Sequence, residues 1–181
     1  MKNLIFFFSA LLLFGCGKET LDNTPRIIKT DVLVKVKGDI TIDKVFEFIN
    51  AYPHEVENIQ SRVYTSNLPQ DSLQYVLDYL NKKPYTNSKG WAVTGYLHYQ
   101  SKEITIFPRL FEMKNVDFQN DWIKTMKILG LKEQNNSEKS GSIIYFHVPK
   151  GEEMEWKNRF EKLDFIEWVE LNYYYPNYNM F

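Results

Sequence analysis

The chain is 181 residues long, has a net formal charge of −1 and contains a single cysteine. Because basic and acidic residues nearly cancel, the chain lacks the strong positive net charge that is typical of nucleic-acid-binding proteins, and no nucleic-acid partner is predicted. One cysteine also excludes an intrachain disulfide. Stability must therefore come from burial, to which an aromatic content of 16% contributes large apolar areas.

The N-terminal segment has the layout of an export signal. A lysine at position 2 precedes an apolar run from Leu4 to Phe14, too short to span a bilayer as the helix of a folded domain. The stretch Leu13-Phe14-Gly15-Cys16 resembles the lipobox of bacterial lipoproteins. The resemblance implies a signal peptide of residues 1–15, a lipidated Cys16 and a tether of residues 16–30. The alternative is a cleaved signal that leaves an idle thiol.

Gly17 stands where inner-membrane lipoproteins usually carry an aspartate. By the same resemblance, the predicted location is the cell envelope, at the outer membrane, on its periplasmic or surface face. Three acyl chains would make attachment to that membrane effectively permanent.

The rest of the chain repeats one order of elements. Alternating apolar residues predict strands, and apolar residues three and four apart predict amphipathic helices. Each half reads strand, helix, short strand, strand, helix, strand. The first half comprises strand 31–38, helix 41–53, two short extended pieces within 54–69, helix 71–84 and strand 91–100; the second comprises strand 103–113, interrupted by Pro108, helix 120–130, a short strand within 131–141, strand 142–149, helix 150–163 and strand 165–175.

This duplication predicts an α+β fold of two tandem ferredoxin-like βαββαβ units, residues 31–101 and residues 102–181, packed as one compact body. In each unit, two helices would cover one face of a four-stranded antiparallel sheet. Tyr96, Tyr145 and His147 are expected on the opposite faces. Those faces either form a binding surface or are buried against each other.

Residues 129–173 resemble the subtilisin-type propeptides and the related protease-inhibitor domains. The shared features are Val148-Pro149, Lys150-Gly151 before the acidic Glu152-Glu153, and a final strand that contains Trp168-Val169-Glu170-Leu171-Asn172. In that family the fold is ferredoxin-like, the open sheet face docks on the protease, and the tail lies in the active-site cleft. The resemblance implies that residues 173–181 are such a tail.

The sequence predicts no enzyme, no cofactor and no metal site. The three histidines lack metal-binding spacing, no serine lies in a nucleophile elbow, and the scattered glycines form no phosphate-binding loop. His54 lies in a Pro-His-Glu turn, where we expect it to be exposed to solvent.

The first functional hypothesis is a lipid-anchored module that binds a protein or peptide. Its sharper version is a propeptide-like inhibitor or chaperone of a subtilisin-like protease. The alternative is an envelope protein that neutralises a toxin, or that has a structural or assembly role. The candidate partner-binding residues are Tyr96, Tyr145, His147, Tyr173, Tyr174, Tyr175, Tyr178 and Phe181.

Overall fold

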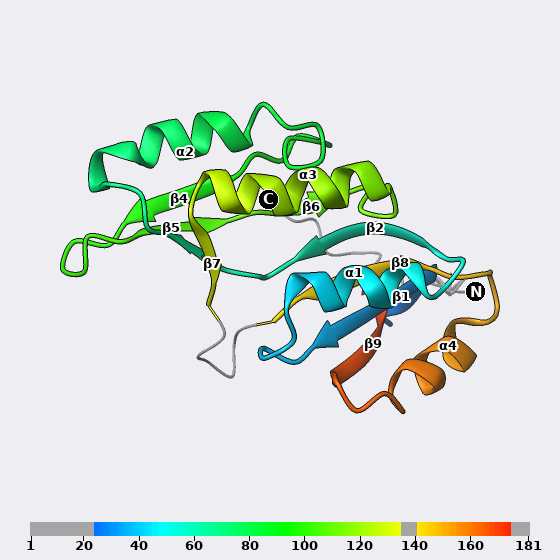
Figure 1. The fold of residues 1–181 in the computed structure, drawn as a ribbon. Coiled ribbons are helices and arrows are strands. Elements are labelled where there is room, and N and C mark those ends of the chain that lie inside the picture. Colours follow the sequence, from blue (N-terminus) through cyan, green and yellow to red (C-terminus); the bar gives the residue numbers. More distant parts are fainter. Residues whose placement is uncertain (1–23, 135–140, 175–181) are drawn as a thin grey trace, which may run out of the picture.

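The computed structural model describes residues 24–134 and 141–174, and this part of the chain has a mixed α+β fold with four α-helices and two antiparallel sheets (Figure 1). The helices follow the predicted order, and a short 3₁₀ turn, Gln70–Ser72, precedes the second. The elements are β1 Arg26–Val36, α1 Ile42–Asn50, β2 Glu55–Gln60, β3 Tyr64–Ser66, α2 Leu73–Leu80, β4 Thr94–Leu97, β5 Ile104–Phe107, β6 Leu110–Phe111, α3 Val116–Ile128, β7 Leu131–Glu133, β8 Ile143–His147, α4 Glu153–Phe160 and β9 Ile166–Tyr174.

The two sheets have the same internal order of strands. The five-stranded sheet is ordered β6-β2-β8-β1-β9, and the four-stranded sheet is ordered β4-β5-β3-β7. If the two-residue β6 is set aside, each sheet places its second, third, first and fourth strands side by side. All paired strands are antiparallel.

The tandem arrangement is not confirmed, because the sheets do not divide the chain near residue 101. The early strands β1 and β2 pair with the late strands β8 and β9, whereas the four-stranded sheet takes all its strands from residues 64–133. We call residues 26–60 and 143–174 the outer unit, and residues 64–133 the inserted unit. The inserted unit thus occupies the connection between β2 and its antiparallel partner β8.

Local backbone features carry the chain from one sheet to the other. Ser61 has a φ of 68°, a left-handed conformation that redirects the chain after β2 instead of closing a hairpin with β3. The chain passes back to the five-stranded sheet at Pro108, where an interruption was predicted. This interruption separates β5, in the four-stranded sheet, from β6, in the five-stranded sheet. One interrupted stretch therefore contributes to both sheets.

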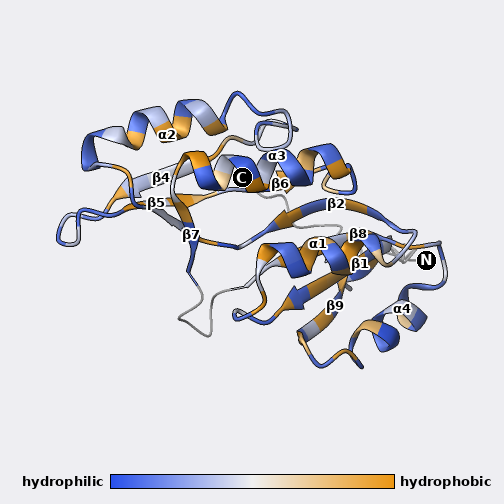
Figure 2. Cartoon of the chain, viewed as in Figure 1, coloured by the Kyte–Doolittle hydropathy of each residue, from blue (hydrophilic) through white to orange (hydrophobic). Residues whose placement is uncertain are grey.

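Each sheet is covered by helices on one face (Figure 1). In the outer unit, Phe48 of α1 contacts Phe146 of β8 and Phe160 of α4 edge to face, each at a ring-centroid distance of 5.6 Å. In the inserted unit, Tyr64 of β3 lies 5.3 Å from Trp122 of α3, and both side chains are fully buried. Figure 2 shows the corresponding alternation of apolar and polar residues along β1 and along the helices.

Helix α1 is held at both ends by the inserted unit. At its start, the Ile42 amide donates to the two carboxylate oxygens of Glu133, at 3.0 and 3.1 Å. At its end, Lys114 Nζ donates to the carbonyls of Ile49 and Tyr52, at 2.8 and 2.6 Å. An anion at the N-terminus and a cation at the C-terminus both complement the helix dipole. The inserted unit is therefore joined to both ends of helix α1 of the outer unit.

A buried arginine completes this junction. Arg62 lies in the connection between β2 and β3 and is 3% exposed. Its side chain forms an ion pair with Glu133, donates from Nε to Ser142 Oγ at 2.9 Å and donates from Nη2 to the Ile40 carbonyl at 2.6 Å. It thus ties β7, the approach to β8 and the approach to α1 to one point. Nothing in the local sequence pattern marks Arg62 as a junction residue.

Candidate functional site

The face of the four-stranded sheet opposite the helices is open at the β4–β5 hairpin. Tyr96 and Phe107 are 48% and 37% exposed, and their rings stack at a centroid distance of 5.8 Å with an interplanar angle of 27°. In the turn of this hairpin, Tyr99 is 85% exposed, and the Lys102 ammonium lies 4.7 Å from its ring centroid. We call Tyr96, Tyr99 and Phe107 the hairpin aromatics. Large rings with polar tips are typical of recognition surfaces.

Tyr145 and His147 lie on the open face of the five-stranded sheet, where both are half-buried. The Tyr145 hydroxyl accepts from Gln60 Nε2 at 3.1 Å. His147 Nδ1 lies 3.0 Å from Asp31 Oδ1, and its Nε2 lies 3.7 Å from Glu57 Oε2. The imidazole is thus flanked by two carboxylates.

Strand pairing explains how these carboxylates reach the histidine. Asp31 stands directly opposite His147 in the β1–β8 register. Glu55 stands opposite His147 in the β2–β8 register, so Glu57, two positions along β2, lies on the same face, at the irregularity between Val56 and Asn58. Asn172 of β9 donates to the second oxygen of Asp31 at 3.0 Å. Sequence reasoning missed Asp31 and Glu57 because their roles depend on β1 and β2 pairing with β8.

This arrangement offers hydrogen bonding rather than a complete catalytic constellation. The network presents carboxylate oxygens, an imidazole and amide groups, which can orient a polar ligand or a partner side chain. Among residues 24–134 and 141–174, no three histidine, cysteine, aspartate or glutamate side chains are grouped so that they could hold a metal ion.

Tyr96 is not brought together with Tyr145 and His147, since they belong to different sheets. Tyr173 and Tyr174 lie at the end of β9 and are 50% and 45% exposed. The remaining predicted site residues, Cys16, Tyr175, Tyr178 and Phe181, lie outside the described residues.

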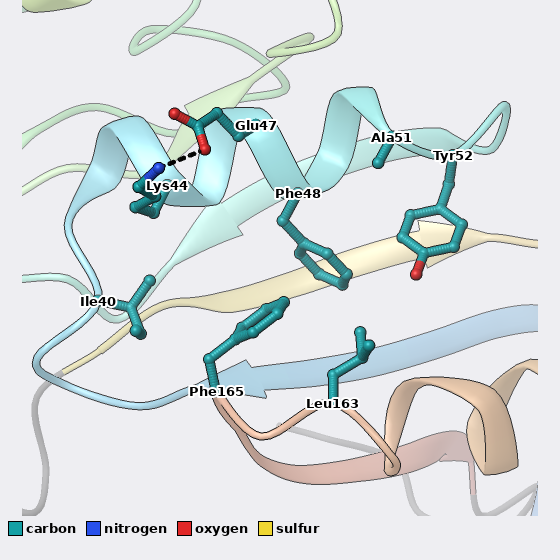
Figure 3. Close-up of a pocket in the computed structure, with 8 residues that line it drawn as sticks. All are labelled: Ile40, Lys44, Glu47, Phe48, Ala51, Tyr52, Leu163 and Phe165. Carbon is teal, nitrogen blue, oxygen red and sulfur yellow. Dashed lines mark hydrogen bonds and ion pairs between the residues drawn. The ribbon is translucent and has the colours of Figure 1, made fainter.

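A pocket of about 350 Å³ opens on the helix side of the outer unit (Figure 3). Phe48 and Tyr52, from α1 and the segment after it, face Leu163 and Phe165 from the connection between α4 and β9. The exposed Lys44–Glu47 ion pair, 2.6 Å long, marks the rim. The apolar lining suits a large apolar side chain. This pocket was not predictable from the sequence, because its lining comes from two segments far apart in the chain.

A broader groove of about 800 Å³ lies where the described chain begins and ends. Arg26 of β1 stands opposite Tyr174 of β9, and the loop before α4 supplies the other wall. The groove is lined by Pro25, Arg26, Ile27, Lys29, Lys150, Gly151, Glu153 and Tyr174. We call it the tether groove, because the segment towards Cys16 leaves from it.

The expectation of a solvated His54 is wrong. This side chain is 7% exposed, and its ring packs edge-on against Trp156 of α4 at a centroid distance of 4.1 Å. Burial lowers the pKa of His54 below its ordinary value, because it disfavours the charged form of the ring. Within the described residues, its Nε2 has no hydrogen-bond partner. The turn was read correctly, but the docking of α4 over it was not visible in the local sequence.

No family model, characterised protein or solved structure significantly matches the chain. The residues and their geometry therefore carry the functional argument. Of the helices in the described part of the chain, none has the length and apolar character needed to cross a membrane.

Proposed function

We propose that this chain is a non-enzymatic, lipid-anchored protein of the cell envelope that binds a protein or peptide partner. The observation that carries the proposal is the open face of the four-stranded sheet, where Tyr96 and Phe107 stack on each other while both remain exposed. Stacked tyrosine and phenylalanine rings offer a rigid contact area that loses little conformational entropy on binding.

The architecture behind this proposal is a ferredoxin-like unit inserted into a second ferredoxin-like unit. The strand order second-third-first-fourth in both sheets supports this assignment, as does the alternation of strands and helices. The insertion point, in the β2–β8 connection, leaves the central pairing of the outer unit intact. In this arrangement the inserted unit contacts both ends of helix α1, and each sheet keeps a face for contacts with other molecules.

The sharper form of the proposal is inhibition or chaperoning of a subtilisin-like protease. Its support is the resemblance of residues 129–173 to propeptide domains. Most of this segment supplies three consecutive elements of the outer unit, β8, α4 and β9. These elements carry Tyr145 and His147 on the open face, the face through which such domains dock on their protease.

Photo-crosslinking in cells tests partner binding. A photoreactive amino acid at position 96 should give a discrete protein adduct. The same amino acid at position 75 should not, because Tyr75 is 53% exposed but lies on helix α2. The matched exposure makes position 75 a direct control for random collision. An absence of adducts at position 96, or identical adducts at both positions, would overturn the proposal.

A protease assay tests the sharper form. The chain from residue 16 with Cys16→Ser should inhibit a subtilisin-like protease, and removal of residues 175–181 should weaken the inhibition. Equal inhibition by both chains would refute the role of the tail. No inhibition by either chain would refute the propeptide-like function while leaving the crosslinking result to stand on its own.

A further inference from the structure

The tether groove has a distinctive charge. Among the described residues that line it, Lys29 and Lys150 bring two ammonium groups, against the single carboxylate of Glu153. That carboxylate is turned to the backbone, because one oxygen accepts from the amides of Thr30 and Gly151, each at 3.0 Å. The nearby Asp31 carboxylate is engaged by His147 and Asn172 on the sheet face. The groove therefore presents a cationic surface.

Exposed apolar side chains surround the same groove. Ile27 and Tyr174 line it and are 42% and 45% exposed. Two further apolar side chains lie next to lining residues without lining the groove themselves. Tyr173 stands opposite Ile27 in the β1–β9 register and is 50% exposed, and Met154 follows Glu153 in α4 and is 54% exposed. A soluble surface rarely gathers aliphatic side chains, tyrosines and lysines in one place. This mixture is typical of surfaces that lie at the boundary between water and lipid.

The position of the groove in the chain identifies its occupant. Only residues 17–25 separate Cys16 from Arg26. At about 3.5 Å per residue, the ten steps from Cys16 to Arg26 span at most about 35 Å, even when fully extended. If Cys16 carries a lipid, the tether groove is therefore the part of the described fold that lies closest to the bilayer. The apolar pocket near Phe48 and Phe165 lies at the other end of β1, beyond Val36.

We infer that the tether groove rests on the headgroup region of a bilayer containing anionic phospholipid, with Lys29 and Lys150 at the headgroups and Ile27, Met154, Tyr173 and Tyr174 at the boundary. The inference rests on the proposed lipid anchor at Cys16. It assigns Tyr173 and Tyr174 to the membrane rather than to the partner, and it leaves the hairpin aromatics for protein contacts. The anchored domain would then have a fixed orientation.

Vesicle sedimentation tests this surface without the lipid anchor. The chain from residue 16 with Cys16→Ser should bind vesicles of phosphatidylcholine with about 30% phosphatidylglycerol more tightly than vesicles of phosphatidylcholine alone, and added salt should weaken the binding. Each basic side chain near such a surface contributes about fivefold in affinity, so Lys29→Glu with Lys150→Glu should reduce binding at least about 25-fold. Ile27→Ser with Met154→Ser should also reduce binding, since it removes the apolar contact.

The matched control is Lys82→Glu with Lys124→Glu, which changes the net charge equally at exposed positions of the inserted unit. This control should retain most of the binding. Equal loss in both charge-reversed chains, or no preference for phosphatidylglycerol, would overturn the inference. Binding to polyglutamate with none to vesicles would also overturn it, and would assign the groove to an acidic protein.

A separate labelling experiment keeps the two proposals distinguishable. Incorporation of labelled palmitate into the full chain should be lost in Cys16→Ser. If labelling fails while phosphatidylglycerol binding persists, the lipid anchor is wrong and the membrane-facing surface stands. If labelling succeeds while vesicle binding fails, the anchor stands and the surface is wrong.

Discussion

Replacing Glu133 by glutamine should sharply destabilise the fold, because it leaves the Arg62 guanidinium without its anionic partner. The side chains of Arg62 and Glu133 are 3% and 10% exposed, so water cannot solvate either charge well enough to replace its partner. Removing one partner of a buried ion pair typically costs about 3–5 kcal/mol. A domain of this size is stabilised by about 5–15 kcal/mol in total, so the variant would lose a large fraction of its stability.

The measurement is urea unfolding, followed by circular dichroism and tryptophan fluorescence. Trp91 and Trp122 lie in the inserted unit, and Trp156 and Trp168 lie in the outer unit, so replacing both tryptophans of one unit lets the fluorescence report on the other unit alone. Because Glu133 and Arg62 join the units, we expect both units to be destabilised together. In thermal unfolding, the loss should lower the midpoint by about 10 °C, at about 2–4 °C per kcal/mol for a chain of this length.

A double-mutant cycle identifies the pair as the cause. Arg62→Met with Glu133→Gln should cost less than the sum of the two single changes, because the double variant leaves no uncompensated buried charge. The control is Glu47→Gln, which breaks the exposed Lys44–Glu47 pair and should cost less than about 1 kcal/mol. A loss below about 1 kcal/mol for Glu133→Gln, or strict additivity in the cycle, would refute the reasoning.

Three further changes probe other parts of the structure. Lys114→Met removes the donor to the carbonyls of Ile49 and Tyr52 and should lower the free energy of unfolding by about 1–3 kcal/mol, measured from the urea midpoint at unchanged slope. Because burial lowers the pKa of His54, the unfolded chain binds more protons than the folded chain once the pH falls below the ordinary value of 6.5, and the free energy of unfolding should decline with acidification. The dependence of the free energy of unfolding on pH should become weaker in His54→Phe but not in the control His98→Phe, whose side chain is exposed. Gly141→Ala should be strongly destabilising, because its φ is 107° and a Cβ would lie 2.2 Å from the Val36 carbonyl oxygen. The control Gly90→Ala has a φ of 77° and open space around it, so it should cost only about 1–2 kcal/mol of left-handed backbone strain. Similar losses of thermal stability in the two variants would contradict this account.

The order of elements was predictable from the sequence, but the pairing of strands was not. Apolar spacing located all four helices. Helix α3 begins at Val116, before the predicted start at position 120, because the Asn115 side chain accepts from the first-turn amide of Asp117. A tandem pair of βαββαβ units and a nested pair read identically along the chain. Local periodicity therefore contains no information that separates them.

For the candidate site, too, the sequence predicted which face of a sheet a residue occupies but not which residues from distant strands lie beside it. Alternation along the strands placed Tyr96 on an exposed sheet face, and Tyr145 and His147 on the face away from the helices. The carboxylates around His147 could not be found in this way, because Asp31 and His147 are 116 positions apart. The same limit applies to Arg62 and Glu133, whose partners are set by how the two units dock.

The nested arrangement also sets the order in which the sheets can be completed during synthesis. β1 is the first described strand to be made, yet both of its neighbours, β8 and β9, come from the last quarter of the chain. All four strands of the inserted unit are available once Glu133 has emerged. A chain stalled just beyond that residue would hold every strand of one sheet while the centre of the other still lacked both neighbours. Such long-range pairing closes slowly, so β1 and β2 stay open to wrong partners until the C-terminal strands arrive.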